Sequence, residues 1–319
     1  MEKRWPQMNN EYTDLLKYVD DALALAKDIP RWWSKFSNRI YCNHQKLVIY
    51  VLMQKLRQTT RGIVSILRCS EELRLHLGLH KVPVHTTIVR FAARIQHLIP
   101  KMLGIRQART VAIDSTGFSL DTRSGYYDTV LERQNSSTHR QFVKLSVAVN
   151  AETGGVISYR LHHDHTHDSQ DFIPLLEEVE CDHVVADKGY DSHKLRQFVR
   201  RKLHARSHIP RRKCTGRRTR GRRIPELNKK IYNQRSLVEN VFFCIKQKYG
   251  SVLRNRTYAS QEGEVISKLF AHNLDRKQKI LVMIILRIAP APAEPNILDV
   301  IWSHIDLIGK HLNGEYFRN

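Results

Sequence analysis

The first part of the chain has the hydrophobic periodicity of helices. In residues 1 to about 105, apolar positions recur three and four residues apart, as on one face of a helix. Thr59, Thr60 and Ser70 precede such stretches, and their hydroxyls can accept hydrogen bonds from the free N–H groups of a first turn. The pattern predicts helices over 12–26, 45–56, 60–67 and about 85–98, with another opening at Ser70. We therefore expect an all-α N-terminal region.

From Thr110 onward the pattern changes to that of strands. Short β-branched or alternating runs are predicted to be strands over 110–114, 142–149, 156–161, 183–187 and 204–209. The turn at 152–155 joins two of them into a hairpin. Helices are expected over about 169–180 and again through Leu195 and Val199, between the later strands. A hairpin followed by strand–helix alternation predicts an α/β fold with a mixed sheet flanked by helices.

The end of the chain again favours helix. Three prolines within 289–295 are typical of a linker, and 297–312 has the pattern of an amphipathic helix. We expect three parts: a helical region for DNA binding or dimerisation over 1–105, the α/β domain over 106–275, and a C-terminal helical tail over 276–319.

Charge narrows the class of protein. The 319 residues include 53 Lys and Arg against 31 Asp and Glu, a net charge of +22. Such an excess favours a polyanionic partner, with nucleic acid the first candidate, an anionic membrane surface the second and a merely basic soluble protein the third. The most apolar run, 280–288, contains Arg287 and is too short to cross a bilayer. The five scattered cysteines argue against a disulfide framework or a zinc knuckle and for a reducing cytoplasm.

Two basic regions are candidate DNA contacts. Residues 201–223 contain eleven Lys or Arg and no acid, which favours contact with a phosphate backbone over a solvated charge run. The predicted contacts there are Arg211, Arg212, Lys213, Arg217 and Arg218. Arg90 and Arg94 lie on the basic helix of a helix-turn-helix-like N-terminal region. A bundle that only packs and dimerises is the alternative.

Three acidic residues are candidates for catalysis. Asp114 and Asp187 each end a short apolar strand, and an α/β fold gathers such strand ends at one edge of its sheet. Either could instead be a helix cap or a turn residue. In the helix predicted further on, Tyr232, Arg235, Glu239 and Lys246 lie within about 60° of arc and form one polar stripe. Such a stripe is also typical of an exposed, salt-bridged surface.

These residues together resemble a known family. The Asp114-Ser-Thr segment, the segment 186–192 (Ala-Asp-Lys-Gly-Tyr-Asp-Ser) and the spacing from Tyr232 to Lys246 are similar to those of insertion-sequence transposases of the DDE type. Within that family they resemble the group with the Tyr-Arg-Glu-Lys signature. The resemblance covers about 105–275 and implies a ribonuclease H-like fold. The short gap between Asp187 and Glu239 leaves little room for the large β-rich insertion of some relatives.

The resemblance also implies a chemistry. Asp114, Asp187 and Glu239 would be catalytic and would hold two Mg²⁺ or Mn²⁺ ions, which prefer hard oxygen ligands. The protein would bind transposon ends, cleave phosphodiester bonds and transfer the 3′-hydroxyl ends to target DNA. The basic and phenolic residues of the stripe, Tyr232, Arg235 and Lys246, would position the DNA. Lys188 is either a further DNA contact or a plain surface lysine. A homodimer and a nucleoid-associated location in a prokaryotic cytoplasm are further expectations, with no membrane.

Other readings stay open. A transposase remnant that binds DNA without cutting it would share the charge and the N-terminal helices, and a ribonuclease H-like nuclease would share the fold. The segment His162–Asp168 holds four histidines, which can indicate a transition-metal site. A structural loop before a helix capped by Asp168 or Ser169 is the favoured interpretation, with a substrate contact as a further alternative.

Overall fold

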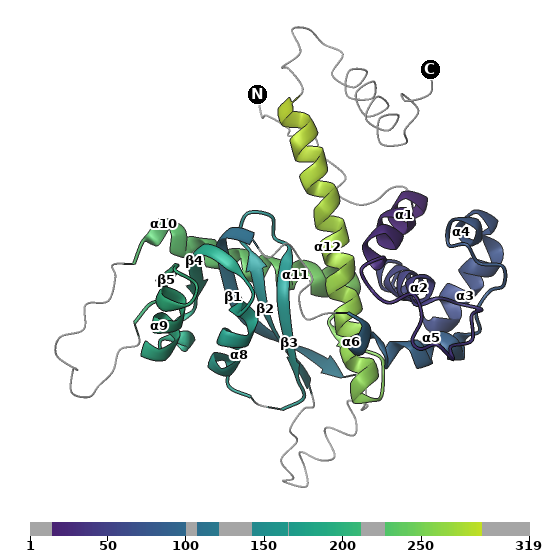
Figure 1. Ribbon diagram of the computed structural model, residues 1–319, viewed down its shortest axis with the longest axis horizontal. Coiled ribbons are helices and arrows are strands. Elements are labelled where there is room, and N and C mark those ends of the chain that lie inside the picture. Colours follow the sequence, from purple (N-terminus) through teal and green to yellow (C-terminus); the bar gives the residue numbers. More distant parts are fainter. Residues whose placement is uncertain (1–14, 100–106, 121–141, 165, 212–226, 289–319) are drawn as a thin grey trace, which may run out of the picture. The chain divides into compact units, whose positions relative to one another are not determined.

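The computed structural model describes residues 15–99, 107–120, 142–164, 166–211 and 227–288. The N-terminal part is all-α (Figure 1). Its helices are α1 (Leu15–Ala26), α2 (Asn43–Lys55), α3 (Thr60–Cys69), α4 (Glu71–His76), α5 (His85–Ala92) and α6 (Ile95–Leu98). The later helices are α8 (Asp168–Leu176), α9 (His193–Arg201), α10 (Lys229–Tyr232), α11 (Ser236–Tyr249) and α12 (Tyr258–Ile288), with single 3₁₀ turns η1 (Lys188–Tyr190) and η2 (Asn233–Arg235).

The N-terminal helices begin where their capping residues predict. The Thr59 hydroxyl accepts a hydrogen bond from the Gly62 N–H at 3.0 Å, and Ser70 accepts one from the Leu73 N–H at 3.3 Å. The single basic helix predicted over 85–98 is wrong in one respect. It is broken into α5 and α6, and Arg94 lies at the break as the residue before α6.

The sheet has strands of both directions. Its main path runs β3 (Val156–His162), β2 (Phe142–Asn150), β1 (Gln107–Leu120), β4 (Glu180–Ala186) and β5 (Arg206–His208), and β6 (Val252–Leu253) pairs with the far end of β1. The first three strands are antiparallel, whereas β1, β4 and β5 are parallel. A mixed sheet in this order, flanked by helices, is the arrangement of the ribonuclease H-like fold. The predicted fold class is confirmed.

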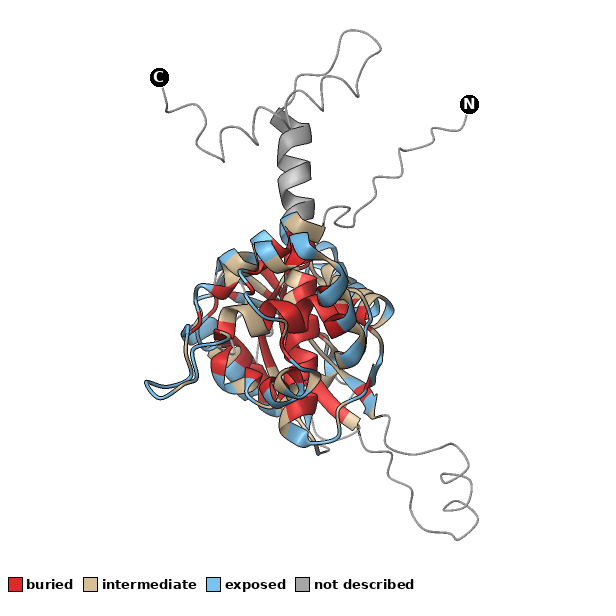
Figure 2. Ribbon diagram, turned by 90° about the vertical axis from the view of Figure 1, so that its right-hand side faces the viewer, coloured by how far each residue is buried: buried red, intermediate tan, exposed pale blue. Residues whose placement is uncertain are grey.

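Alternation along the strands gives the sheet two buried faces. Alternate residues such as Val111 and Ile113 pack with α8 and α9, while Ala112 packs with α11, α12 and the N-terminal helices. Figure 2 shows that most buried residues lie in the strands and in the helix segments packed on them. Because both faces are covered, the strands read as nearly continuous apolar runs.

The turn between β2 and β3 is as predicted. The Asn150 side chain accepts hydrogen bonds from the N–H groups of Glu152 and Thr153, at 2.8 and 3.2 Å. Gly154 has a φ of +70°, a conformation that glycine adopts without the steric cost of a side chain. This local chemistry fixes the hairpin register.

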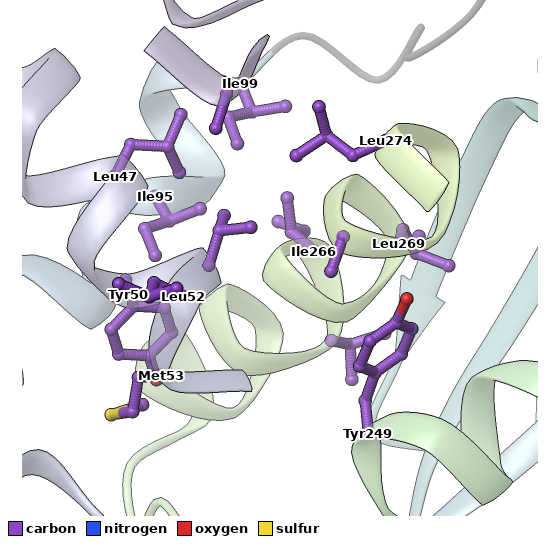
Figure 3. Packing of buried hydrophobic residues seen from close by; sticks show 14 of the residues in the cluster. Leu47, Tyr50, Leu52, Met53, Ile95, Ile99, Tyr249, Ile266, Leu269 and Leu274 are labelled. Carbon is purple, nitrogen blue, oxygen red and sulfur yellow. The ribbon is translucent and has the colours of Figure 1, made fainter. Parts of the chain in front are cut away.

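Helix α12 was not predicted, and it joins the N-terminal helices to the sheet. Ile266, Leu269 and Leu274 of α12 share one core with Leu47 of α2 and Ile95 of α6 (Figure 3). At Gly263 the helices approach so closely that an added Cβ would lie 2.0 Å from the Ala92 carbonyl oxygen. The approach leaves no room for a side chain at that position.

A buried carboxylate reinforces this junction. Asp275 of α12 accepts hydrogen bonds from Lys55 Nζ of α2 at 2.9 Å, from Lys248 Nζ of α11 at 3.0 Å and from the Tyr249 hydroxyl at 2.8 Å. Burial alone would raise the pKa of Asp275, but the bond from Lys55 and the charges of the two lysines outweigh it and hold the pKa below its usual value.

Contacts divide the chain into one compact unit over 1–278 and another over 279–319. Within the first unit, the core that α12 shares with the N-terminal helices runs on to the sheet. The predicted boundary between 105 and 106 stays a prediction, and the predicted linker and tail helix over 289–312 lie outside the described residues. Among the helices that the structure describes, none has the length and apolar character needed to cross a bilayer.

Candidate active site

Strand register brings the two aspartates together. In the parallel ladder of β1 and β4, Ile113 pairs with Ala186, so the next residues, Asp114 and Asp187, lie side by side. Side chains alternate between the two faces of a sheet, and Ile113 and Ala186 point to the face covered by α8 and α9. Asp114 and Asp187 therefore point to the other face, which α11 covers. Asp187 directly follows β4, as predicted. Asp114 does not end its strand, since β1 continues to Leu120.

Glu239 of α11 is linked to Asp114 by an arginine that pairs with both. The Arg235 guanidinium lies 3.5 Å from Asp114 Oδ2 through Nη1 and 2.6 Å from Glu239 Oε1 through Nη2. One cation thus pairs with two of the three predicted acids, one on the sheet and one on the helix above it. Arg235 and Glu239 form the i,i+4 ion pair that is typical of a salt-bridged helix surface, and Arg235 also contacts Asp114 of the sheet.

The environment of Asp114 is electrostatically crowded. Burial raises the pKa of Asp114, and the negative charges of Glu239 and Asp187 raise it further, while a hydrogen bond from the Ser115 N–H and the Arg235 charge act in the opposite direction. Carboxylates that disfavour one another's charge need cations nearby. Arg235 supplies one positive charge to the group.

Lys246 is anchored on the same face of β1. Its Nζ donates a hydrogen bond to the Thr116 hydroxyl at 2.6 Å and lies 5.6 Å from the centre of the Phe118 ring. Thr116 is two residues beyond Asp114, so the two side chains point to the same side of the strand. Burial lowers the pKa of Lys246. An ammonium group is thereby held in a fixed place beside the acids.

The predicted single helix through the polar stripe is wrong. Tyr232 ends α10, the 3₁₀ turn η2 follows, and only then does α11 begin. Arg235 and Glu239 still lie one turn apart because the backbone remains right-handed across the break. On the opposite face of α11 Val241 and Ile245 are buried, whereas Leu237 is only partly buried.

The remaining predicted DNA contacts are spread over the molecule. Lys188 is exposed in η1, directly after Asp187, and Arg90 and Arg94 are exposed at α5 and at the α5–α6 break. Arg211 is exposed after β5. Four predicted contacts lie outside the described residues: Arg212, Lys213, Arg217 and Arg218. No structural observation tests these assignments, and they stay predictions.

The family of the chain follows from its sequence. A family model described as "Transposase DDE domain" matches residues 105–274, which is more than half of the chain. The chain belongs to the DDE transposase domain family. The match covers β1, β4 and α11, the elements that carry the three acids. The narrower Tyr-Arg-Glu-Lys group stays a prediction.

The chain also resembles a solved structure. A solved structure similar to it is the cryo-EM structure of a piggyBac transposase synaptic complex with hairpin DNA. The sequence identity is 9%, the TM-score is 0.42, and the similarity covers 86% of this chain and 74% of that chain. No curated protein matches the transposase sequence.

The three acids are of the right chemical type to bind a divalent metal ion, but Arg235 lies between two of them in the structure. Members of the family generally use divalent metal ions. Three carboxylates suit Mg²⁺ or Mn²⁺, which take oxygen ligands. Yet in the part of the chain that the structure describes, no three His, Cys, Asp or Glu side chains are arranged to hold one ion. Arg235 occupies the position between Asp114 and Glu239 instead.

The histidine-rich segment of the transposase makes structural contacts. His162 Nε2 lies 2.7 Å from Asp171 Oδ1, and His163 Nε2 lies 3.2 Å from Glu262 Oε1. The His167 ring accepts a hydrogen bond from the Ser169 N–H at the start of α8. The described histidines thus go to separate partners, in keeping with the structural loop. The cap of α8 is His167, so the prediction of Asp168 or Ser169 as the cap is wrong.

Sequence reasoning missed a second polar cluster behind the acids. Lys144 of β2 is buried, and its Nζ lies 2.7 Å from Asp168 Oδ1 and also donates to the Thr166 carbonyl. Burial would raise the pKa of Asp168, but hydrogen bonds from Lys144 and Ser115 lower it overall. Ser115 follows Asp114, so this cluster supports the strand from the opposite face. Lys144, a charged residue within the mostly apolar strand 142–149, was the sequence feature that could have indicated this cluster.

Proposed function

We propose that the protein is a DNA transposase that binds transposon ends, cleaves phosphodiester bonds and transfers the 3′-hydroxyl ends to target DNA. The observation that carries the proposal is the register of β1 and β4, which sets Asp114 beside Asp187 on the face where α11 brings Glu239. Asp114 and Asp187 lie side by side at one end of the parallel strands, and Arg235 links Asp114 to Glu239 of α11. Ligands bind at this end of α/β sheets.

In this proposal Asp114, Asp187 and Glu239 hold two Mg²⁺ or Mn²⁺ ions. Bound there, the ions would activate the attacking oxygen and stabilise the leaving oxygen of the phosphodiester. Lys246 is held by Thr116 beside the acids and binds a phosphate of the DNA. Tyr232 and Lys188 position the strand on either side.

Arg235 has two successive partners in this scheme. In the structure its guanidinium neutralises Asp114 and Glu239. The carboxylates must be released from it before they can serve as metal ligands. A guanidinium binds phosphate in the same forked geometry as carboxylate. Arg235 therefore turns from the two acids to the DNA backbone when the site is assembled.

The wider surface is basic enough for a DNA partner. The net charge of +22 supports binding of double-stranded DNA, both transposon ends and target. We assign the helical region 1–105 to DNA binding or dimerisation, the domain 106–275 to catalysis, and the part 276–319 to a tail. Two ends must be held together for joining, which favours a homodimer. A nucleoid-associated place in a prokaryotic cytoplasm completes the proposal.

The test is cleavage and strand transfer on DNA carrying the ends of the element, with Mg²⁺, for wild type and Glu239→Gln. The substitution keeps the size of the side chain and removes its charge. We expect binding to persist and both reactions to fall. Removing a residue that only supports a metal ligand costs about 10- to 100-fold, so the loss of a ligand itself should be larger. Glu177→Gln, an exposed acid at the end of α8, is the matched control and should remain active.

Two outcomes would favour other functions. If wild type binds the ends but neither cuts nor joins them, the protein is a DNA-binding remnant. If wild type cleaves RNA or DNA flaps and never joins strands, it is a nuclease of the same fold.

A third outcome concerns the site. If Glu239→Gln cuts as well as wild type, Glu239 is a surface residue paired with Arg235 and the three-acid site is wrong.

A further inference from the structure

The segment between α1 and α2 exposes an unusual number of aromatic side chains. We call residues 30–41 the aromatic loop. Phe36 is 86% exposed and Trp33 is 44% exposed, and Trp32 lies beside them. Large apolar side chains gathered on a surface mark an interaction site more often than a free face. None of the residues is part of the candidate active site.

The aromatic loop is held in a defined shape. The Asn43 N–H donates to the Arg31 carbonyl at 2.8 Å, and the Asn43 side chain donates to the Pro30 carbonyl at 3.0 Å. Between Ser34 and Ser37, two hydrogen bonds of 2.9 and 3.1 Å close a turn. Phe36 lies in that turn, with the Lys35 ammonium 5.1 Å from the centre of its ring. A loop fixed before binding loses less entropy when it binds.

A second element joins the loop to a predicted DNA contact. The Arg94 guanidinium lies 5.4 Å from the centre of the Trp33 ring, and the His97 ring meets the same indole edge-on with centroids 6.2 Å apart. Arg31 lies 5.7 Å from the centre of the Trp32 ring. Cations therefore lie against both indoles, that of exposed Trp33 at the α5–α6 break and that of half-buried Trp32 in the loop itself.

The charge around the loop selects a polyanion. From Ile29 to Ser70 the sequence contains eight Lys or Arg and no Asp or Glu. A second copy of a chain with net charge +22 would bring more positive charge to this surface, so electrostatics disfavour it as the partner. Contact with duplex phosphates alone would not need exposed aromatic rings. Exposed rings flanked by cations are the combination that binds unstacked bases together with their phosphates.

We propose that the aromatic loop binds unpaired DNA bases, with Phe36 and Trp33 stacking on the bases and Arg31, Lys35 and Arg94 contacting the flanking phosphates. The proposal rests on the DNA-binding part of the proposed function and adds the structural state of the DNA. The loop adds affinity where a strand leaves the duplex, and adds little on fully paired DNA.

The experiment measures binding of full-length protein to two labelled DNAs by fluorescence anisotropy. One is a blunt duplex of the element end, and the other is the same duplex with a single-stranded extension. We expect Phe36→Ala to weaken binding of the extended DNA roughly tenfold, as the loss of one stacked base does, and to leave the blunt duplex within about twofold. Phe36→Trp should restore the preference, because indole also stacks.

A control and a second readout separate stacking from structure. Leu75 is 71% exposed on α4, so Leu75→Ala removes a comparable exposed apolar side chain and should change neither affinity. Tryptophan fluorescence should be quenched by the extended DNA more than by the duplex. The excess quenching should be lost in Trp33→Phe.

The other outcomes are distinct. Equal weakening on both DNAs, or none on either, overturns the proposal while DNA binding stands. If vesicles of anionic lipid bind wild type and lose binding in Phe36→Ala, with both DNAs unaffected, the partner is a membrane and the proposal is overturned. If Phe36→Ala changes only the sedimentation of the protein, the loop is an interface between copies. If wild type binds neither DNA, the proposed function itself fails.

Discussion

Replacing Asp275 by asparagine tests the buried junction of three helices. The carboxylate on α12 has a side-chain exposure of 4%, and its partner Lys55 on α2 has one of 9%. Asparagine has nearly the same shape, so packing is preserved while the charge is lost. The ammonium group of Lys55 then stays buried among α2, α11 and α12 and loses the charge of Asp275.

The size of the effect follows from burial. Breaking a buried pair by removing one partner costs about 3–5 kcal/mol, because the remaining charge is uncompensated. Lys248, whose side chain is 26% exposed, adds less because water solvates it. With about 2–4 °C of Tm per kcal/mol in a large domain, we expect a fall of roughly 10 °C. Lys55→Met combined with Asp275→Asn should be more stable than the two separate losses predict.

Urea unfolding followed by circular dichroism gives the free energy of unfolding for wild type, both single variants and the double variant. The coupling between Lys55 and Asp275 is the departure from additivity. If Asp275→Asn costs less than about 1 kcal/mol, or if the two losses simply add, the carboxylate does not hold the junction. Glu177→Gln, at an exposed site, should leave the unfolding free energy unchanged within about 0.5 kcal/mol.

Three further predictions use other contacts. Gly263→Ala should destabilise the protein by about 1–3 kcal/mol in urea unfolding, although alanine favours helix, because its Cβ would meet the Ala92 carbonyl oxygen; a stabilised variant would contradict the close approach. Burial lowers the pKa of His272 to about 4, so the unfolded chain binds a proton near its ordinary value of about 6.5 and the folded chain does not. Stability should therefore fall as pH falls from 6.5 to 4, and His272→Gln should flatten that part of a stability–pH profile; an unchanged slope would refute this. Thr116→Val removes the acceptor of Lys246 and should slow DNA cleavage several-fold, for a hydrogen bond of about 1 kcal/mol, with duplex affinity nearly constant; full activity would show that Lys246 needs no anchor.

The parts of the fold that follow a simple period could be predicted. The strands around Asp114 and Asp187 have buried faces on both sides and read as apolar runs, which places both acids correctly next to each other in the sheet. The extent of β1 could not be predicted in this way. Its continuation through Ser115 and Thr116 is polar, because Ser115 donates a hydrogen bond to Asp168 and Thr116 accepts one from Lys246.

Helix α12 escaped prediction because polar side chains occupy its buried positions. Glu264 is buried and accepts hydrogen bonds from the Asn255 N–H and side chain, and Lys268 pairs with it at 3.2 Å. Asp275 binds the junction lysines. A pattern of apolar and polar residues assumes that polar means exposed, whereas these buried polar groups are satisfied by partners in the same helix, in the segment before it and, for Asp275, in the distant α2. The contact between Asp275 and Lys55 leaves no local signal.

The position of α12 also sets the order in which the chain can fold. Helices α2 and α6 are synthesised long before residues 258–275. The faces that pack against α12 therefore stay uncovered while the whole sheet is synthesised. Contacts so far apart in sequence form late. A product that stops before α12 would hold all three acids and the basic helices, but with their shared core open to proteases. The cell is thereby expected to accumulate only chains in which α12 has closed the core shared by the N-terminal helices and the sheet.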